Sequence, residues 1–202
     1  MEIIVDGIKD MVVVEDNEHE TLEDFFNKFK THASENEKIV TLISIDGYAI
    51  TPPFVDDIFS RSLTDVKVLN IETVSVKALC LQTMDEIDIH LKECIAEFKK
   101  ASDIIYSQKY DESAALIARA VKKWRYCQQA IDMITNIIVA KNNGIDVTRI
   151  KDNYKKLEEV IIQLSETLEN HDFMMVKDVI DYELLDKLEE TMTQKDVLKD
   201  YL

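Results

Sequence analysis

The residues that could carry out chemistry begin with four ionisable side chains on one predicted helical face. Spacings of four, three and four residues join Glu86, His90, Glu93 and Glu97. Imidazole and carboxylate groups at such spacing are ligand types of protein metal sites. Di-iron bundles, however, carry Glu-x-x-His on each of two helices, whereas this chain has His-x-x-Glu once. We therefore expect neither a metal nor another cofactor, and interpret these residues as a solvated helix face.

A second acidic group lies near His171 in the last predicted helix and comprises Asp178, Asp181 and Glu183. Paired carboxylates act as acid and base where their surroundings separate their pKa values, which a sequence does not display. Cys94 follows His90 by four residues and could form a nucleophile pair with it. Because Cys94 falls on an apolar stripe, where a buried thiol is inert, we predict no catalytic set.

Cysteine and glycine usage narrows the possible classes of protein. The three cysteines match no zinc or redox spacing, and the three glycines stand in separate turns, so no phosphate-binding loop is present. Buried free thiols are typical of a reducing compartment. The first residues do not resemble a signal peptide, and no run of about 20 apolar residues occurs. These features predict a cytoplasmic protein.

The charge of the chain is strongly acidic but uneven. A net charge of −16 repels nucleic-acid phosphate and anionic lipid, so we expect neither nucleic acid nor membrane as a partner. Residues 99–125 nevertheless hold seven basic and three acidic residues, among them Lys122, Lys123 and Arg125. This segment is either a docking patch for an acidic partner or is paired with acidic helices of the same bundle. We favour the second interpretation.

The first 75 residues alternate between strand and helix patterns. Two Asp-Gly steps, Asp6-Gly7 and Asp46-Gly47, supply the positive φ of tight hairpins. Thr21 and Asp24 resemble a capping box, with Asp in place of the usual Glu or Gln, and apolar residues at helical spacing follow. The expected elements are strands 2–6 and 11–15, a helix from 21 to about 32, strands 38–45 and 48–50, a helical turn 54–60 and a strand 66–74.

This order of hairpin, helix, hairpin, helical turn and strand resembles the ubiquitin-like β-grasp family over residues 1–75. The resemblance implies a binding module, because most family members with this shape bind other proteins. Some members are conjugated or carry sulfur through a C-terminal Gly-Gly, and this chain has no glycine near residues 73–78. The resemblance therefore does not imply conjugation or sulfur transfer.

The third predicted strand is apolar on both faces. Strict alternation places Ile39, Thr41, Ile43 and Ile45 on one face, and Val40, Leu42 and Ser44 on the other. Because one helix covers one face, the second face has to meet something else. We expect it to pack on the helices of this chain, and the alternative is a partner-binding face at Val40 and Leu42.

Residues 83–202 are predicted to form an antiparallel bundle of about four helices after a linker at 76–82. Thr83 and Glu86 form a capping box, and breaks are expected near 107–110, 142–144 and 170–172, with a frayed end at 193–202. The third helix carries a heptad seam, which either lines a groove, is buried inside the bundle or drives a homodimer. The seam consists of Ile150, Tyr154, Leu157, Ile161, Leu164 and Leu168.

The sequence therefore predicts an α+β chain with a β-grasp domain (1–75), a linker (76–82) and a helical bundle (83–202). We expect a non-enzymatic adaptor or scaffold that binds another protein, basic or amphipathic, through surface complementarity. A secretion-chaperone-like protein that binds an aggregation-prone client helix, and an enzyme with a site in an interdomain groove at His90, Glu93 or Asp178, are the alternatives. The candidate partner contacts are Val40, Leu42, Lys122, Lys123, Arg125, Leu157, Ile161 and Leu164.

Overall fold

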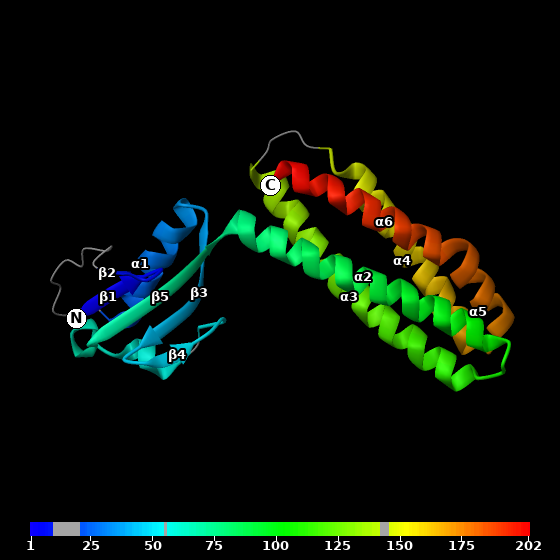
Figure 1. The fold of residues 1–202 in the computed structure, drawn as a ribbon, viewed down its shortest axis with the longest axis horizontal. Coiled ribbons are helices and arrows are strands. Elements are labelled where there is room, and N and C mark those ends of the chain that lie inside the picture. Colours follow the sequence, from blue (N-terminus) through cyan, green and yellow to red (C-terminus); the bar gives the residue numbers. More distant parts are fainter. Residues whose placement is uncertain (10–20, 55, 142–145) are drawn as a thin grey trace. The chain divides into compact units, whose positions relative to one another are not determined.

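The computed structural model describes residues 1–9, 21–54, 56–141 and 146–202, and it divides the chain into two compact units. The first unit contains residues Met1–Leu79 and the second Cys80–Leu202. A mixed sheet with one covering helix makes up the first unit, and helices make up the second (Figure 1). This arrangement confirms the predicted α+β class, a β-grasp sheet followed by a helical bundle.

The sheet of the first unit has five strands in the order β2-β1-β5-β3-β4. Strand β1 pairs parallel with β5, whereas all other neighbouring strands are antiparallel. The strands are β1 (Glu2–Val5), β2 (Ile8–Lys9), β3 (Lys38–Ile45), β4 (Tyr48–Ile50) and β5 (Val68–Ser75). The strand that we expected at residues 11–15 lies outside the described residues, and β2 instead directly follows the first Asp-Gly turn.

Two Asp-Gly turns hold β5 from both sides. Asp6 and Asp46 have φ values of 52° and 50°, and the glycines that follow have 78° and 89°, which is the geometry of type I′ hairpins. The Asp46 carboxylate accepts hydrogen bonds from the backbone N–H groups of Lys67 (2.9 Å) and Val68 (2.8 Å). The Asp6 carboxylate accepts one from the Thr73 backbone N–H (2.7 Å). Each turn residue thereby also fixes the central strand.

Asp6 is expected to stabilise the first unit in a pH-dependent way. Burial would raise the pKa of Asp6, but hydrogen bonds from Thr73 and the Lys38 ammonium (2.9 Å) outweigh it and hold the pKa below its ordinary value. Because the folded pKa is lowered, this stabilisation is present above the unfolded pKa and is lost as pH falls through the folded pKa. Asp6→Asn should cost about 1 kcal/mol at neutral pH.

Urea unfolding followed by circular dichroism at several pH values measures this difference. The difference between wild type and Asp6→Asn should shrink as pH falls from about 4 through the lowered folded pKa of Asp6, since Asp6 gains a proton and loses its charge over that range. The exposed carboxyl of Asp65 serves as the control, and Asp65→Asn should have little effect at any pH. A destabilisation by Asp6→Asn that stays constant down to pH 2 would contradict the role of its charge.

A β-bulge corrects the predicted faces of β3. The register of β3 on β5 shifts between Val40 and Leu42, so Val40 and Ile43 lie on the same face. Val40 is 5% exposed and belongs to the hydrophobic core, whereas Leu42 is half-buried on the other face. The prediction from strict alternation was wrong for Val40. A side chain buried in this core offers no surface to a partner.

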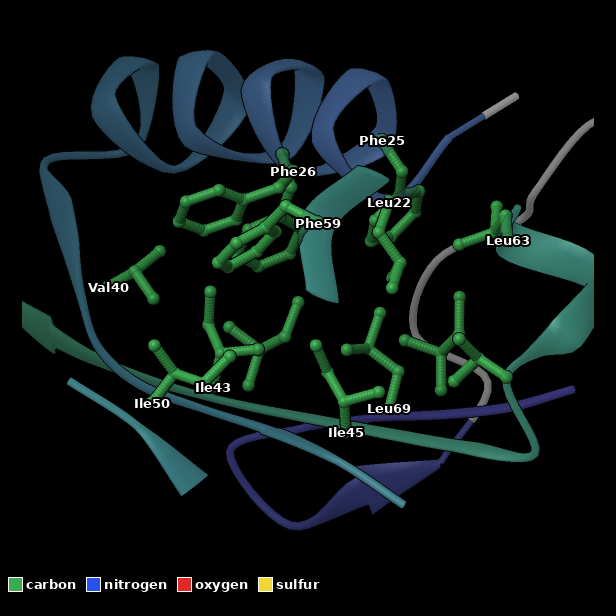
Figure 2. Packing of buried hydrophobic residues seen from close by; sticks show 14 of the residues in the cluster. Leu22, Phe25, Phe26, Val40, Ile43, Ile45, Ile50, Phe59, Leu63 and Leu69 are labelled. Carbon is green, nitrogen blue, oxygen red and sulfur yellow. The ribbon is translucent and has the colours of Figure 1, made fainter. Parts of the chain in front are cut away.

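Helix α1 (Leu22–Glu35) covers one face of the sheet. The Thr21 side chain accepts a hydrogen bond from the Asp24 N–H, and the Asp24 carboxylate accepts one from the Thr21 N–H, which confirms the predicted capping box. Phe25 and Phe26 from this helix face the apolar side chains of the sheet (Figure 2). Two short 3₁₀ turns, η1 (Asp57–Ser60) and η2 (Leu63–Asp65), contribute Phe59 and Leu63 to the same core.

The second unit is built from helices with short connections. They are α2 (Val76–Ile105), α3 (Tyr110–Lys141), α4 (Thr148–Glu169), α5 (Phe173–Val179), a π-helical turn η3 (Ile180–Leu184), α6 (Leu185–Val197) and a 3₁₀ turn η4 (Leu198–Tyr201). The predicted breaks near 107–110 and 170–172 are confirmed, with Gln108 and His171 at φ values of 57° and 55°. The predicted stop at 142–144 lies outside the described residues.

Helix α2 begins earlier than the capping box at Thr83 predicts. The hydroxyl of Ser75 accepts a hydrogen bond from the Ala78 N–H (3.1 Å), as an N-cap side chain does three residues before the bonded group. The helix then continues from Val76 through Thr83 without a break. Residues 76–82, which we expected to form a linker, are therefore helical.

The C-terminal residues are also more ordered in their secondary structure than predicted. Elements α5, η3, α6 and η4 follow one another without a gap from Phe173 to Tyr201. Lys195 and Leu198, which lie in the segment expected to fray, are 0% and 1% exposed. Burial of these two side chains explains why the end of the chain stays helical.

Contacts within the second unit show that α2 and α3 run antiparallel. Later residues of α3 meet earlier residues of α2, since Lys123 bonds Glu93 whereas Arg119 bonds Glu97. Helix α4 packs against α5 and α6. Trp124 is 0% exposed, and its ring meets that of Tyr154 edge-on at 5.8 Å between centroids. The tryptophan therefore belongs to the core of the bundle.

Candidate functional site

The face of α2 that we considered as a metal site, and predicted to be solvated, forms ion pairs with α3 through Glu93 and Glu97. The Lys123 ammonium lies 2.7 Å from a Glu93 oxygen and 3.4 Å from a Glu97 oxygen, and Arg119 lies 3.4 Å from Glu97. The hydrogen bond from Lys123 lowers the pKa of Glu93. Over the described ranges, no group of three or more His, Cys, Asp or Glu side chains is placed to hold a metal ion.

The basic segment of α3 is divided between paired and unpaired cations. Lys123 and Arg119 face α2 and neutralise its carboxylates, as we favoured for this segment. Lys122 and Arg125 are exposed, and neither forms an ion pair with another described residue. The two unpaired cations thus remain available on the surface of a chain with a net charge of −16.

Exposed apolar side chains accompany these two cations on α3. Tyr126 is 46% exposed, and the edge of its ring is held against His90 of α2 at 5.2 Å between centroids. Met133 is 66% exposed and follows Tyr126 by seven residues, which is two helical turns. Because a helix rises 1.5 Å per residue, Lys122 to Met133 spans about 16 Å of one exposed helix side. We call Lys122, Arg125, Tyr126 and Met133 the α3 face.

The heptad seam of α4 is internal. Leu157, Ile161 and Leu164 are 0%, 2% and 1% exposed, because α5 and α6 pack against this side of α4. The seam therefore forms no open groove for a partner within the described part of the bundle. Its burial is what an antiparallel bundle requires, and it corrects the assignment of these three residues as surface contacts.

A partly buried polar network joins α2 to the C-terminal helices. Ser102 is 1% exposed and donates a hydrogen bond to the Asp181 carboxylate (2.6 Å), while the Lys177 ammonium bonds both Ser102 (3.0 Å) and Asp181. The bond with Asp181 raises the pKa of Lys177, which keeps its proton and cannot serve as a base. Asp181 lies in the π-helical turn. The network fixes the two elements together.

Lys195 was not predicted to be of interest, yet its side chain is fully buried. Its ammonium lies 2.6 Å from Asp88 of α2 and 2.7 Å from Asp196. Lys199 lies 3.7 Å from Asp85 and 3.8 Å from Asp88, so α6, η4 and α2 are linked by several ion pairs. The sequence does carry a signal for this burial, because Lys195 follows Leu188 by seven residues and therefore lies on the same apolar face of the helix.

The three cysteines are buried and free. Burial raises the pKa of Cys94 to about 12 and that of Cys127 to about 11. Thiols with such high pKa values stay protonated at neutral pH and are poor nucleophiles. The predicted structural role of these cysteines agrees with their position.

A polar groove of about 510 Å³ lies between α3 and α4. Each helix contributes four residues at spacings that place them on one side of it, and these residues were not recognised from the sequence. They are Gln128, Asp132, Thr135 and Asn136 of α3, and Lys151, Tyr154, Lys155 and Glu158 of α4. The residues named for the alternative of an enzyme, His90, Glu93 and Asp178, are not part of this groove.

Helix length and composition also bear on the membrane. None of the helices in the described segments combines the length and the apolar character that crossing a bilayer requires.

The fold and these surfaces define a two-unit protein, in which a β-grasp sheet unit precedes a helical bundle that carries the α3 face. Comparison with family models matches residues 1–75 to the TP0873 N-terminal domain and residues 82–194 to a domain of unknown function, DUF8042. The second match covers more than half of the chain, which therefore belongs to the DUF8042 family. Neither family description names ubiquitin. No curated protein and no solved structure matched the chain.

Proposed function

We propose that this protein is a protein-binding module, an adaptor or scaffold, that captures an acidic amphipathic segment on the α3 face. The observation that carries the proposal is the pair of exposed cations, Lys122 and Arg125, that form no ion pair within the described chain. Neighbouring Lys123 and Arg119 are both paired with α2, whereas these two positive charges can meet carboxylates of another molecule.

Apolar anchors beside the cations support an amphipathic partner. Tyrosine and arginine are enriched among residues that dominate binding energy, and methionine adapts its shape to varied partners. Contact with His90 holds the Tyr126 ring in place, so less side-chain entropy is lost when a partner binds. A partner segment would place acidic groups at Lys122 and Arg125, and an apolar side chain between Tyr126 and Met133.

The β-grasp topology of residues 1–75 agrees with this proposal. Most domains of the ubiquitin-like β-grasp family are binding modules, and the first unit has their strand order, although the family model that it matches is a different one. We also propose that the protein is cytoplasmic, because the three cysteines of the chain are buried free thiols.

Affinity capture from a lysate of the source cells tests the proposal. Lys122→Glu combined with Arg125→Glu should remove a stoichiometric partner that wild type retains, because the variant presents carboxylates to an acidic segment. The matched control is Lys92→Glu with Lys100→Glu, which makes the same change in net charge at two exposed positions of α2. The control should retain the partner.

Two outcomes would contradict the proposed site. Either wild type is recovered alone, or both double variants lose the partner equally, which would reflect net charge and not the α3 face. Raising the salt concentration should weaken the wild-type complex, since exposed charge pairs are screened.

A further inference from the structure

Aromatic side chains gather on the surface at the end of the bundle where α2 ends, α3 begins and α5 lies beside both (Figure 1). The rings of Tyr110 in α3 and Phe173 in α5 are stacked, with 4.0 Å between their centroids. The Lys177 ammonium of α5 lies 5.1 Å from the centre of the Tyr106 ring, and Tyr106 directly follows α2. Tyr106 and Tyr110 are nevertheless 70% and 38% exposed. Three helices therefore bring aromatic surface together at this end of the bundle.

Met174 extends this aromatic surface along α5. Its side chain is 54% exposed, and it precedes Lys177 by three residues, a spacing that makes two side chains neighbours on a helix. Phe173 precedes Lys177 by four residues and is likewise its neighbour. We call Tyr106, Tyr110, Phe173 and Met174 the bundle-end surface. Exposed apolar surface that is continuous in this way marks sites where proteins meet.

Contacts within the bundle hold the bundle-end surface in shape before a partner binds. The Lys177 ammonium donates a hydrogen bond to the buried Ser102 hydroxyl (3.0 Å) and pairs with Asp181, so its position beside the Tyr106 ring is fixed. The Asp172 side chain caps α5 immediately before Phe173. Rings that are already held in place lose little side-chain entropy on binding, and tyrosine is enriched among residues that dominate binding energy.

The segments that form this end of the bundle are strongly acidic. Residues 102–112 and 169–182 hold seven acidic and two basic residues. Both basic residues are engaged within the chain, because Lys109 pairs with a carboxylate in the first turn of α3 (3.3 Å) and Lys177 pairs with a carboxylate of the π-helical turn. The bundle end therefore presents negative charge to an approaching molecule.

Three exposed carboxylates at this end form no ion pair with another residue that the structure describes. Each lies one to four residues along the chain from a member of the bundle-end surface. Complementary charge attracts a basic segment to them, whereas an acidic segment is repelled. The three carboxylates belong to Asp103, Asp111 and Asp178.

We propose that the bundle-end surface binds a basic amphipathic segment of another protein. Apolar side chains of the segment pack on the rings of Tyr106 and Tyr110 and on Met174, a residue type that adapts its shape to a partner. Lysine or arginine side chains of the segment meet the three unpaired carboxylates. The surface is separate from the α3 face, because Lys122 lies about 18 Å along α3 from Tyr110. It does not depend on the function proposed for the α3 face.

Selection of a phage-displayed library of random peptides on the full chain tests this surface. The selected peptides should carry net positive charge and apolar residues at helical spacing. Fluorescence anisotropy of a labelled selected peptide then measures affinity. Tyr106→Ser combined with Met174→Ser should weaken binding at least about tenfold, as loss of dominant contact residues does. Tyr126→Ser with Met133→Ser removes the same two residue types from the exposed α3 face, and this control should bind like wild type.

A second pair of variants tests the charge of the surface. Asp103→Asn with Asp178→Asn should weaken binding of the same peptide. Asp152→Asn with Asp186→Asn makes the same change in net charge at exposed positions of α4 and α6, and it should leave the affinity unchanged. All four positions are exposed, so both double variants should fold like wild type, which circular dichroism checks.

Three results would overturn the proposal. The first is that the selected peptides are acidic, or that none is selected. The second is that Tyr106→Ser with Met174→Ser binds the selected peptide as tightly as wild type does. The third is a dimer of the wild-type chain in sedimentation that the same double variant dissolves, which would assign the surface to a second copy of the chain.

Discussion

Replacing Trp124 by alanine should destabilise the helical unit by about 3–5 kcal/mol. The indole of Trp124 projects from α3, is completely buried and contacts the Tyr154 ring of α4. Its loss therefore removes apolar contact area and leaves a cavity that neighbouring side chains fill only in part. Because domains are stable by about 5–15 kcal/mol, this loss is a large part of the total.

Urea unfolding followed by far-UV circular dichroism measures the effect, since the variant lacks the only tryptophan and its fluorescence. Trp124→Phe keeps an aromatic ring in the core and should lose clearly less stability than Trp124→Ala. A loss below 1 kcal/mol for the alanine variant would show that Trp124 does not anchor the core.

Replacing Lys195 by alanine should cost the second unit about 3 kcal/mol. The substitution leaves the Asp88 carboxylate without the ammonium that lies 2.6 Å from it, and it opens space where a long side chain was fully buried. Removing one partner of a largely buried pair is more harmful than removing both, because Asp88, whose side chain is 27% exposed, then keeps only the more distant ammonium of Lys199 at 3.8 Å.

A double-mutant comparison separates these contributions. Lys195→Met retains the volume of the side chain and should be less harmful than alanine, and adding Asp88→Asn should recover much of the remaining loss. Thermal and urea unfolding of the single and double variants measure this recovery. Equal stability of Lys195→Ala and wild type would mean that the buried ion pair does not hold α6 to α2.

Turn chemistry explains why the order of elements could be predicted. Asp6-Gly7 and Asp46-Gly47 require positive φ, and the structure places both in tight hairpins. Breaks at Gln108 and His171 likewise follow from local polar sequence between apolar stripes. These signals depend on a few adjacent residues, which is why the sequence alone sufficed.

Features that depend on the third dimension were predicted less well. Val40 was assigned to the outer face because strict alternation does not anticipate a bulge, and the bulge depends on pairing with β5. The start of α2 was misplaced because Ser75 and Thr83 are both good caps, and local sequence does not choose between them. Lys195 follows the apolar stripe of its helix, but a lysine was not expected to be buried there.

The candidate binding residues were likewise predicted only as far as local sequence allows. Charge pattern identified the basic segment but did not distinguish Lys123, which pairs with α2, from Lys122 and Arg125, which do not. That distinction depends on which side of α3 faces another helix. The polar groove between α3 and α4 gave no recognisable motif, because its residues come from two different helices.

Photo-crosslinking from the α3 face tests the central proposal most directly. A photoreactive phenylalanine analogue placed at position 126 in the source cells should give one discrete adduct with a partner protein, and Lys122→Glu with Arg125→Glu should abolish it. The same analogue at the exposed position 182, on the π-helical turn, should not form that adduct. No adduct from position 126, or the same adduct from both positions, would contradict binding at the α3 face.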